Sequence, residues 1–229
     1  MSDINRGSSI LLIRFHSKIL VILTTCVLLL ILAFLFFFNK NDYEKPIPLY
    51  TVGQPSIGNP NAKVHVVDFQ DPKCNNCIVY HNDDYQKLYE NFIKTGLVRY
   101  TIYLVAELPN SYVIARLFFC VNSQSTDAFF NLLDLYYQNP SLALTEQELN
   151  TQLMRLVANS SLNINMNNLQ QCTALHTFEN QVIANTNYAR DIMCGIVQTP
   201  TLFVNGIRLV RPTYKELQDL IQLELNKER

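Results

Sequence analysis

The chain has 229 residues, of which 48% are hydrophobic and 11% aromatic, so it can bury a substantial core and is not a disordered protein. Its net charge is −1, and its basic residues form no stripe and no zinc-finger pattern, which excludes the common nucleic-acid-binding classes. Its six glycines are never spaced as GxGxxG or GxxxxGK, so a nucleotide-binding loop is also excluded.

An uncharged apolar run, Ile19 to Phe38, follows a short N-terminal segment. A helix of about 20 such residues is about 30 Å long, which matches the hydrocarbon core of a bilayer. A cleaved signal peptide is the alternative, but its apolar region is shorter and ends in a small-residue cleavage site that is missing here. Three basic residues and one acid precede the run, which keeps the N-terminus cytoplasmic. We therefore expect a cytoplasmic segment (1–18), a transmembrane signal anchor (19–38) and an exported remainder.

The exported part is predicted to begin with a proline-containing tether over residues 39–60 and to continue as a βαβ unit. The run VHVVDF from Val64 predicts a buried strand. Apolar residues at helical spacing follow as far as Ile93, and VRYTIYLV from Val98 predicts a second strand. Two strands joined by one helix imply a parallel pair with the helix crossing over it.

The pattern becomes helical after the second strand. Residues 112 to about 193 carry helical periodicity, with a capping box at Thr145 and Glu148, and predict four or five helices. The chain then returns to β structure. TLFV, the turn Asn205-Gly206 and IRLV predict a hairpin, and a final helix follows.

The predicted fold is therefore α/β with an all-helical insertion. We assign residues 61–109 and 195–229 to the α/β domain and residues 110–194 to the insertion.

Two cysteines, Cys74 and Cys77, lie between the first strand and the following helix. The helix dipole and free N–H groups favour an anion at a helix N-terminus and lower the pKa of a thiol there. A thiolate of low pKa is a selective nucleophile and a good leaving group in disulfide exchange. A second cysteine one turn later can close the disulfide from a more buried position. This spacing predicts a redox-active pair in which Cys74 is attacked by substrates and Cys77 is the resolving thiol.

Two further features accompany the pair. Asp68 lies on the strand that leads into the site, where a buried carboxylate can exchange a proton with Cys77; a solvated acid at a strand edge is the alternative. Thr199-Pro200 precedes a predicted strand, where a cis X-Pro bond would be useful.

The segments DFQDPKCNNC and VQTPTLFVNG resemble the thioredoxin superfamily, and the helical insertion between them is similar to that of the DsbA-type thiol:disulfide oxidoreductases. The resemblance covers about Pro55 to Leu225. It implies a thioredoxin-like fold, a redox-active cysteine pair, a buried acid at Asp68, a cis Pro200 packed against the cysteines, and substrate backbone pairing beside Thr199.

The helical insertion adds a second implied pair. ARLFFCVNSQ and NLQQCTAL resemble the helical domain of this branch, which often carries cysteines at these places. Cys120 and Cys172 are therefore either a structural disulfide or two buried thiols. A further cysteine, Cys194, is expected to be a packed small hydrophobe rather than a third redox thiol.

The resemblance also implies an activity. We expect an enzyme without a cofactor that forms disulfides in cysteine-containing exported proteins and is recharged by a DsbB-like membrane redox partner. A monomer is expected, anchored in a bacterial inner membrane with its C-terminal domain in the periplasm. The alternatives are a reductase or isomerase of the same fold and a non-catalytic, tethered chaperone or binding module with an inert disulfide. Asn75-Asn76 lacks the histidine that holds the thiolate in strongly oxidising members, so a less oxidising couple is expected.

No metal is expected at the cysteines. A zinc site using His81 would lack a fourth ligand. Ile78 stands where a haem-attachment motif needs histidine, and copper-delivery proteins of this fold use a longer spacing between the cysteines. Lys73, Tyr80 and His81 are expected to be exposed, either as part of the docking surface or simply as solvated polar residues.

Overall fold

The structure is a computed structural model that describes residues 23–33, 43–140 and 145–227. Residues 23–33 are helical, and the described residues from Glu44 onwards belong to a separate compact unit. Within the described residues, no helix combines the length and the apolar character needed to cross a membrane. Both ends of the predicted anchor (19–38) lie outside them.

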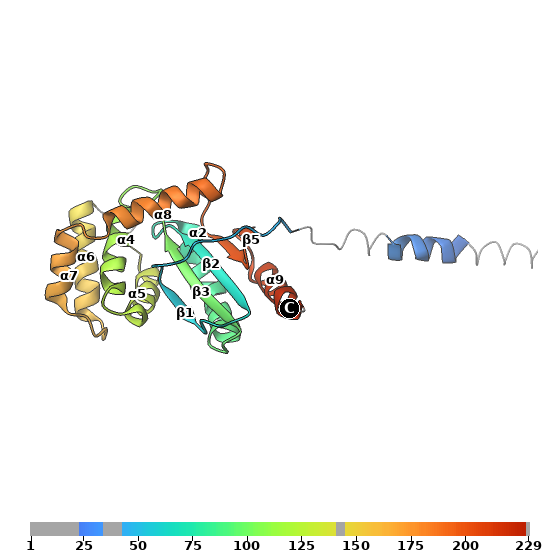
Figure 1. The fold of residues 1–229 in the computed structure, drawn as a ribbon, viewed down its shortest axis with the longest axis horizontal. Coiled ribbons are helices and arrows are strands. Elements are labelled where there is room, and N and C mark those ends of the chain that lie inside the picture. The colour runs from blue at the N-terminus through green and yellow to red at the C-terminus, as the bar shows by residue number, and fades with distance from the viewer. Residues whose placement is uncertain (1–22, 34–42, 141–144, 228–229) are drawn as a thin grey trace, which may run out of the picture. The chain divides into compact units, whose positions relative to one another are not determined.

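A five-stranded sheet forms the centre of the compact unit (Figure 1). Its strands are β1 (Ser56–Gly58), β2 (Val64–Gln70), β3 (Val98–Leu104), β4 (Thr201–Val204) and β5 (Ile207–Val210), in the order β1-β3-β2-β4-β5. β2 and β3 are parallel and every other neighbouring pair is antiparallel, which confirms the predicted βαβ unit and the hairpin. The short β1 was not predicted, because three residues carry no alternation pattern and only the pairing with β3 makes them a strand.

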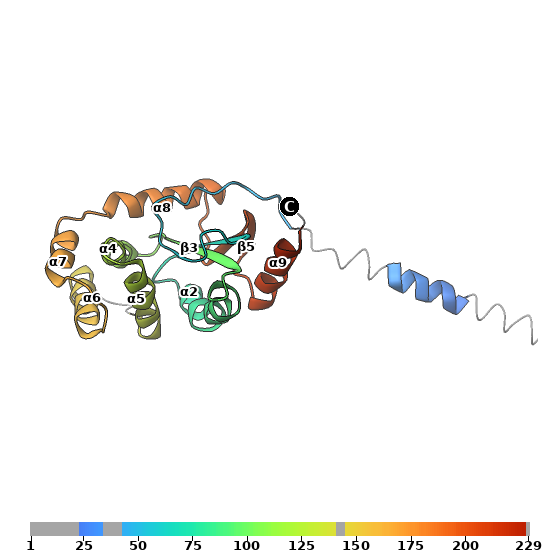
Figure 2. The same cartoon turned by 60° about the horizontal axis from the view of Figure 1, so that its bottom comes forward.

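Helices cover both faces of the sheet. The crossover between β2 and β3 is a continuous helical run that begins with α2 (Asn75–Tyr80). It continues as the π-helical segment η1 (His81–Tyr85), the α-helical α3 (Gln86–Leu88) and a second π-helical segment, η2 (Tyr89–Ile93). This run and α9 (Tyr214–Asn226) pack on one face, and α8 (Glu179–Ile192) lies across the other (Figure 2).

The alternation of side chains along β2 decides what reaches each face. Val67 and Phe69 point toward α8, where they join an apolar cluster with Ala189 and Met193. Asp68 and its neighbours at even positions therefore point to the opposite face, beneath the helix that carries the cysteines. Asp68 pairs with Ile102 of β3 and Leu202 of β4, so it occupies the central strand of the sheet.

The insertion is all-helical, as predicted. Its helices are α4 (Ser111–Asn122), α5 (Thr126–Gln138), α6 (Glu146–Asn159) and α7 (Met166–Ala174), which gather beside the sheet before α8 returns across it (Figure 1). The capping box of Thr145 and Glu148 begins α6. Cys120 and Cys172 form a disulfide between α4 and α7, with an S–S distance of 2.01 Å.

The Asn205-Gly206 turn joins β4 to β5 with positive φ at both residues, 48° and 85°. A side chain at Gly206 would collide with the backbone of Ile47, whose N–H donates to the Gly206 carbonyl at 3.0 Å. Glycine is therefore required here by the close approach as well as by the turn. Part of the segment expected to be a tether thus packs against the hairpin.

Candidate active site

Cys74 is the N-cap residue of α2, with an extended backbone immediately before the first helical residue. The neighbouring Cys77 thiol lowers the pKa of Cys74 to about 5, with smaller contributions from the Thr199 side chain and the backbone of Cys77 and Asn76, against the opposing effect of partial burial. Cys74 is therefore mainly a thiolate at neutral pH, the reactive form in disulfide exchange.

Cys77 has the opposite environment. Its side chain is fully buried, and burial raises its pKa well above the ordinary thiol value, with further contributions from Cys74 and from the charge of Asp68. Cys77 stays protonated at neutral pH and can keep donating to the Cys74 sulfur. Both cysteines are free thiols here, so the structure represents the reduced state.

The Thr199–Pro200 peptide bond is cis and lies beside Cys74. The Thr199 carbonyl accepts a hydrogen bond from the Cys74 thiol at 3.4 Å. Two segments separated by more than 120 residues therefore meet at the reactive sulfur. The proline cannot donate from its nitrogen, which leaves this side of the site without a competing backbone donor.

Asp68 is fully buried beneath the helix that begins at Cys74. Its Oδ2 accepts from Gln70 Nε2 at 2.5 Å and from the Tyr100 hydroxyl at 2.6 Å. The Tyr137 hydroxyl, which comes from α5 of the insertion, donates to Gln70 Oε1 at 2.9 Å. Burial raises the pKa of Asp68 to about 7, although the Tyr100 and Gln70 hydrogen bonds oppose the shift. Asp68 can therefore hold or release a proton near neutral pH.

The sequence did not identify the supporting residues of this acid. Gln70 lies two residues after Asp68, just beyond the strand predicted from Val64. Tyr100 lies two residues before Ile102, the partner of Asp68 on β3, and was read only as an interior position of the second predicted strand. Tyr137 was read only as an apolar position of a helix. The available signal was the even spacing of Asp68 and Gln70, which places both on one face.

Asp71 is a second buried acid that the sequence did not single out for the site. Its Oδ2 accepts from the backbone N–H groups of Glu107 and Leu108 at 2.8 and 2.9 Å. Its Oδ1 accepts from the backbone N–H of Lys73 at 2.8 Å and from the Ser111 hydroxyl. This carboxylate ties the loop before Cys74 to the loop before α4 and so fixes the position of the reactive cysteine.

Three expectations about nearby residues are wrong. Tyr80 and His81 are buried, with 5% and 1% exposure, and do not belong to the docking surface. His81 instead contacts Asp134 of α5 through Nε2 at 2.6 Å, because its position on the helix faces the insertion. Cys194 is exposed rather than packed, in a left-handed conformation at the end of α8. Across the residues that the structure describes, no group of three metal-ligating side chains comes together.

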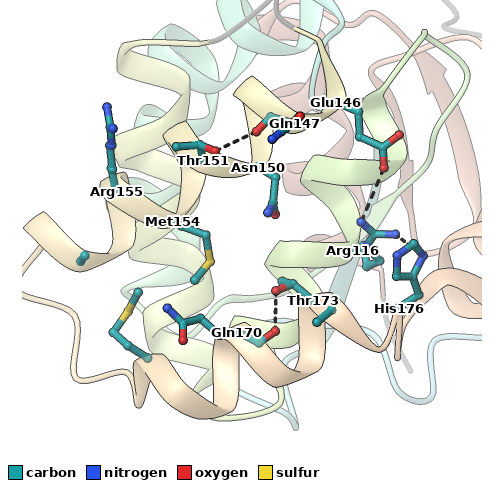
Figure 3. A pocket seen from close by; sticks show the side chains of 13 residues that line it. Arg116, Glu146, Gln147, Asn150, Thr151, Met154, Arg155, Gln170, Thr173 and His176 are labelled. Atoms are coloured by element: carbon teal, nitrogen blue, oxygen red, sulfur yellow. Dashed lines mark hydrogen bonds and ion pairs between the residues drawn. The ribbon is translucent and has the colours of Figure 1, made fainter.

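A wide cavity lies away from the cysteines. It has a volume of about 760 Å³ and lies between α6, α7 and Arg116 of α4 (Figure 3). Arg116 is buried, and its charge is offset by Glu146 at 3.9 Å and Glu179 at 3.7 Å, while His176 lies within hydrogen-bond distance at 2.7 Å. None of the residues predicted for the site lines this cavity.

Replacing Asp68 with asparagine tests the raised pKa. A buried acid whose pKa rises on folding loses stability as the pH increases from about 4 to about 7, and a neutral amide does not. Relative to the native protein, Asp68→Asn is therefore expected to gain little stability at low pH and up to about 4 kcal/mol above the folded pKa. Urea unfolding of the reduced proteins across this pH range measures the difference. A difference that does not change with pH would show that Asp68 ionises normally.

Comparisons with known proteins agree with this geometry. The thioredoxin family model matches residues 50–223. Disulfide bond formation protein D of Bacillus subtilis is 30% identical over 178 residues, which is 76% of this chain and 78% of the relative. A putative protein-disulfide oxidoreductase of Rickettsia bellii is 26% identical over 66% of this chain, and the match spans 57% of that relative.

Solved structures show the same fold. BdbD from Bacillus subtilis in its oxidised form superimposes with a TM-score of 0.69 at 28% identity, over 82% of this chain and all of the other. DsbA of Chlamydia trachomatis gives a TM-score of 0.66 at 23% identity, over 79% of this chain and 95% of the other. The chain therefore belongs to the thioredoxin family and, within it, is a DsbA-type thiol:disulfide oxidoreductase.

Proposed function

We propose that this protein is a membrane-anchored, exported oxidase that forms disulfide bonds in cysteine-containing substrate proteins through Cys74 and Cys77. The observation that carries the proposal is the difference between the two thiols: the pKa of Cys74 is lowered to about 5 and that of Cys77 is raised. Stabilising the Cys74 thiolate stabilises the reduced enzyme, which favours passing the disulfide on to a substrate.

The reaction begins with the Cys74–Cys77 disulfide. A substrate thiolate attacks the Cys74 sulfur, the bond to Cys77 breaks, and Cys77 leaves with the electron pair. A second substrate thiolate then attacks the substrate sulfur of the mixed disulfide, and Cys74 leaves as a thiolate. Two electrons pass from the substrate dithiol to the enzyme, and the substrate gains one disulfide.

Asp68 supplies the proton that Cys77 needs in the first step. A Cys77 thiolate would be unfavourable in its buried position, because burial is the main cause of its raised pKa. A carboxyl group with a pKa of about 7 is partly protonated at neutral pH and can give up that proton. Thr199 and Pro200 offer an extended substrate segment a backbone edge beside Cys74, supported by the 3.4 Å distance between the Cys74 sulfur and the Thr199 carbonyl oxygen.

The membrane anchor is supported by the apolar run over residues 19–38, of which residues 23–33 are helical. The large apolar side chains of this helix are exposed, including Leu30 at 69% and Leu29 at 65%. An exported active site also needs an electron acceptor for reoxidation, for which a DsbB-like membrane protein is the partner we propose. An alkaline carbonate wash tests the anchor: the protein should stay in the membrane pellet, and its release into the wash would contradict anchoring.

The direction of exchange is tested with the full-length protein in a non-ionic detergent. The oxidised enzyme is mixed with an equal amount of a reduced peptide that carries two cysteines, and the products are quenched with acid and analysed by mass spectrometry. We expect nearly complete oxidation of the peptide, because the Cys74 thiolate makes the reduced enzyme the more stable form. Cys77→Ser is the matched control, since it keeps Cys74 but cannot carry the disulfide.

The opposite result defines the alternative function. If the reduced enzyme instead reduces the peptide disulfide to completion, the protein is a reductase or isomerase of the same fold. If neither direction proceeds, the cysteine pair is inert and the binding-module alternative holds.

A further inference from the structure

Arg211, immediately after β5, lies against the cis-proline turn. Its backbone N–H donates to the Pro200 carbonyl at 2.9 Å, and its Nε donates to the Thr199 carbonyl at 3.3 Å. The Thr199 carbonyl is also the acceptor for the Cys74 thiol, at 3.4 Å. Because the Arg211 Nε and the Cys74 sulfur contact the same carbonyl oxygen, the distance between them is no more than the sum of these two contact distances. The Arg211 guanidinium therefore stands at the rim of the site.

Lys73 is a second cation near the site, since it directly precedes Cys74 in the chain and is partly exposed. Arg211 is exposed as well. Among the described residues, neither of these two side chains lies within 4.0 Å of a carboxylate. Their charges are thus not offset by an ion pair within the described part of the protein.

The acids closest to this rim are already engaged. Asp71 is buried, and its carboxylate receives four hydrogen bonds. Glu107, in the loop before α4 whose backbone donates to Asp71, pairs with Arg190 at 2.8 Å. Asp68 lies in the core beneath the helix. Among the described residues, Lys73 and Arg211 are thus two exposed cations near Cys74 in the fold or the chain that form no ion pair.

We propose that Lys73 and Arg211 determine specificity by favouring substrate segments that carry Asp or Glu next to the reacting cysteine. A segment bound along Thr199 and Pro200 brings residues adjacent to its cysteine close to both cations. Nε anchors the Arg211 guanidinium to the Thr199 carbonyl, so its two terminal nitrogens remain to bind a carboxylate in a bidentate manner. This inference rests on the proposed function, because it concerns the substrates of the same exchange.

The test compares two reduced peptides that each carry two cysteines and differ only in having aspartate or lysine beside them. The oxidised, full-length protein in non-ionic detergent is mixed with each peptide, and the initial rate of peptide oxidation is measured. Each rate is divided by the rate of the same peptide with an uncharged disulfide, 2-hydroxyethyl disulfide, which removes differences in thiol reactivity without adding a charge preference of its own. We expect the aspartate peptide to react about five-fold faster at low salt, and this ratio to fall toward one at about 0.5 M salt.

The variants assign the effect to the two cations. Lys73→Gln and Arg211→Gln should each lower the ratio, and the double variant should bring it close to one. Arg211→Lys keeps the charge and should retain most of the preference. Arg155→Gln is the matched control, because Arg155 is an exposed arginine on α6 and forms no ion pair with the described residues; it should leave the ratio unchanged.

Each outcome separates the two hypotheses. If neither peptide is oxidised, the proposed function fails. If both are oxidised at equal normalised rates, the function holds and the specificity proposal is overturned. The proposal is also overturned if the glutamine variants keep the native ratio, or if alkylation of Cys74 across pH shows a shift in its pKa that accounts for the whole change in rate. Circular dichroism identifies a variant that fails to fold, and the two single variants then replace the double variant.

Discussion

The site depends on one interaction, between the Cys77 thiol and the Cys74 sulfur, which makes the largest contribution to the lowered pKa of Cys74. This interaction requires Cys74 to occupy the N-cap position of α2 and Cys77 to lie one turn later with its proton retained. Burial retains that proton, since it raises the pKa of Cys77. The same burial that makes Cys77 a poor acid thus makes Cys74 a good leaving group.

The surrounding fold supports this arrangement from three directions. From below, the central strand β2 places Asp68 under the helix, within a hydrogen-bonded group that includes Tyr137 from the insertion. Beside it, the cis-proline turn supplies the Thr199 carbonyl. In front, Asp71 fixes the loop that leads into Cys74. The insertion therefore contributes to the chemistry through Tyr137 as well as covering the domain.

Much of the fold follows from local sequence signals. The CNNC spacing, the Asn205-Gly206 turn and the capping boxes each act over a few residues, so the strands, helices and hairpin around them could be predicted. The residues that the sequence did not reveal act over long separations. Tyr137 reaches Gln70 across 67 positions, and β1 exists only through its pairing with β3. His81 was misjudged for the same reason, since the α5 helix that contacts it comes later in the chain.

The family resemblance supplied what local patterns could not. The disulfide between Cys120 and Cys172 spans 52 residues, and no spacing rule connects these two cysteines. The resemblance also led us to expect a less oxidising couple, because no histidine lies between Cys74 and Cys77. That expectation concerns the reduction potential and stays a prediction.

The most direct measurement is the reduction potential of the Cys74–Cys77 pair as a function of pH, by equilibration of the full-length protein with glutathione. We expect a value at neutral pH between about −120 mV, as in DsbA, and about −270 mV, as in thioredoxin. Reduction takes up two protons below the pKa of Cys74 and one above it, so the slope should change from about 59 to about 30 mV per pH unit near the Cys74 pKa of about 5. A potential at or below that of thioredoxin, with a single slope of about 59 mV per unit through neutral pH, would contradict a stabilised Cys74 thiolate and the oxidase role built on it.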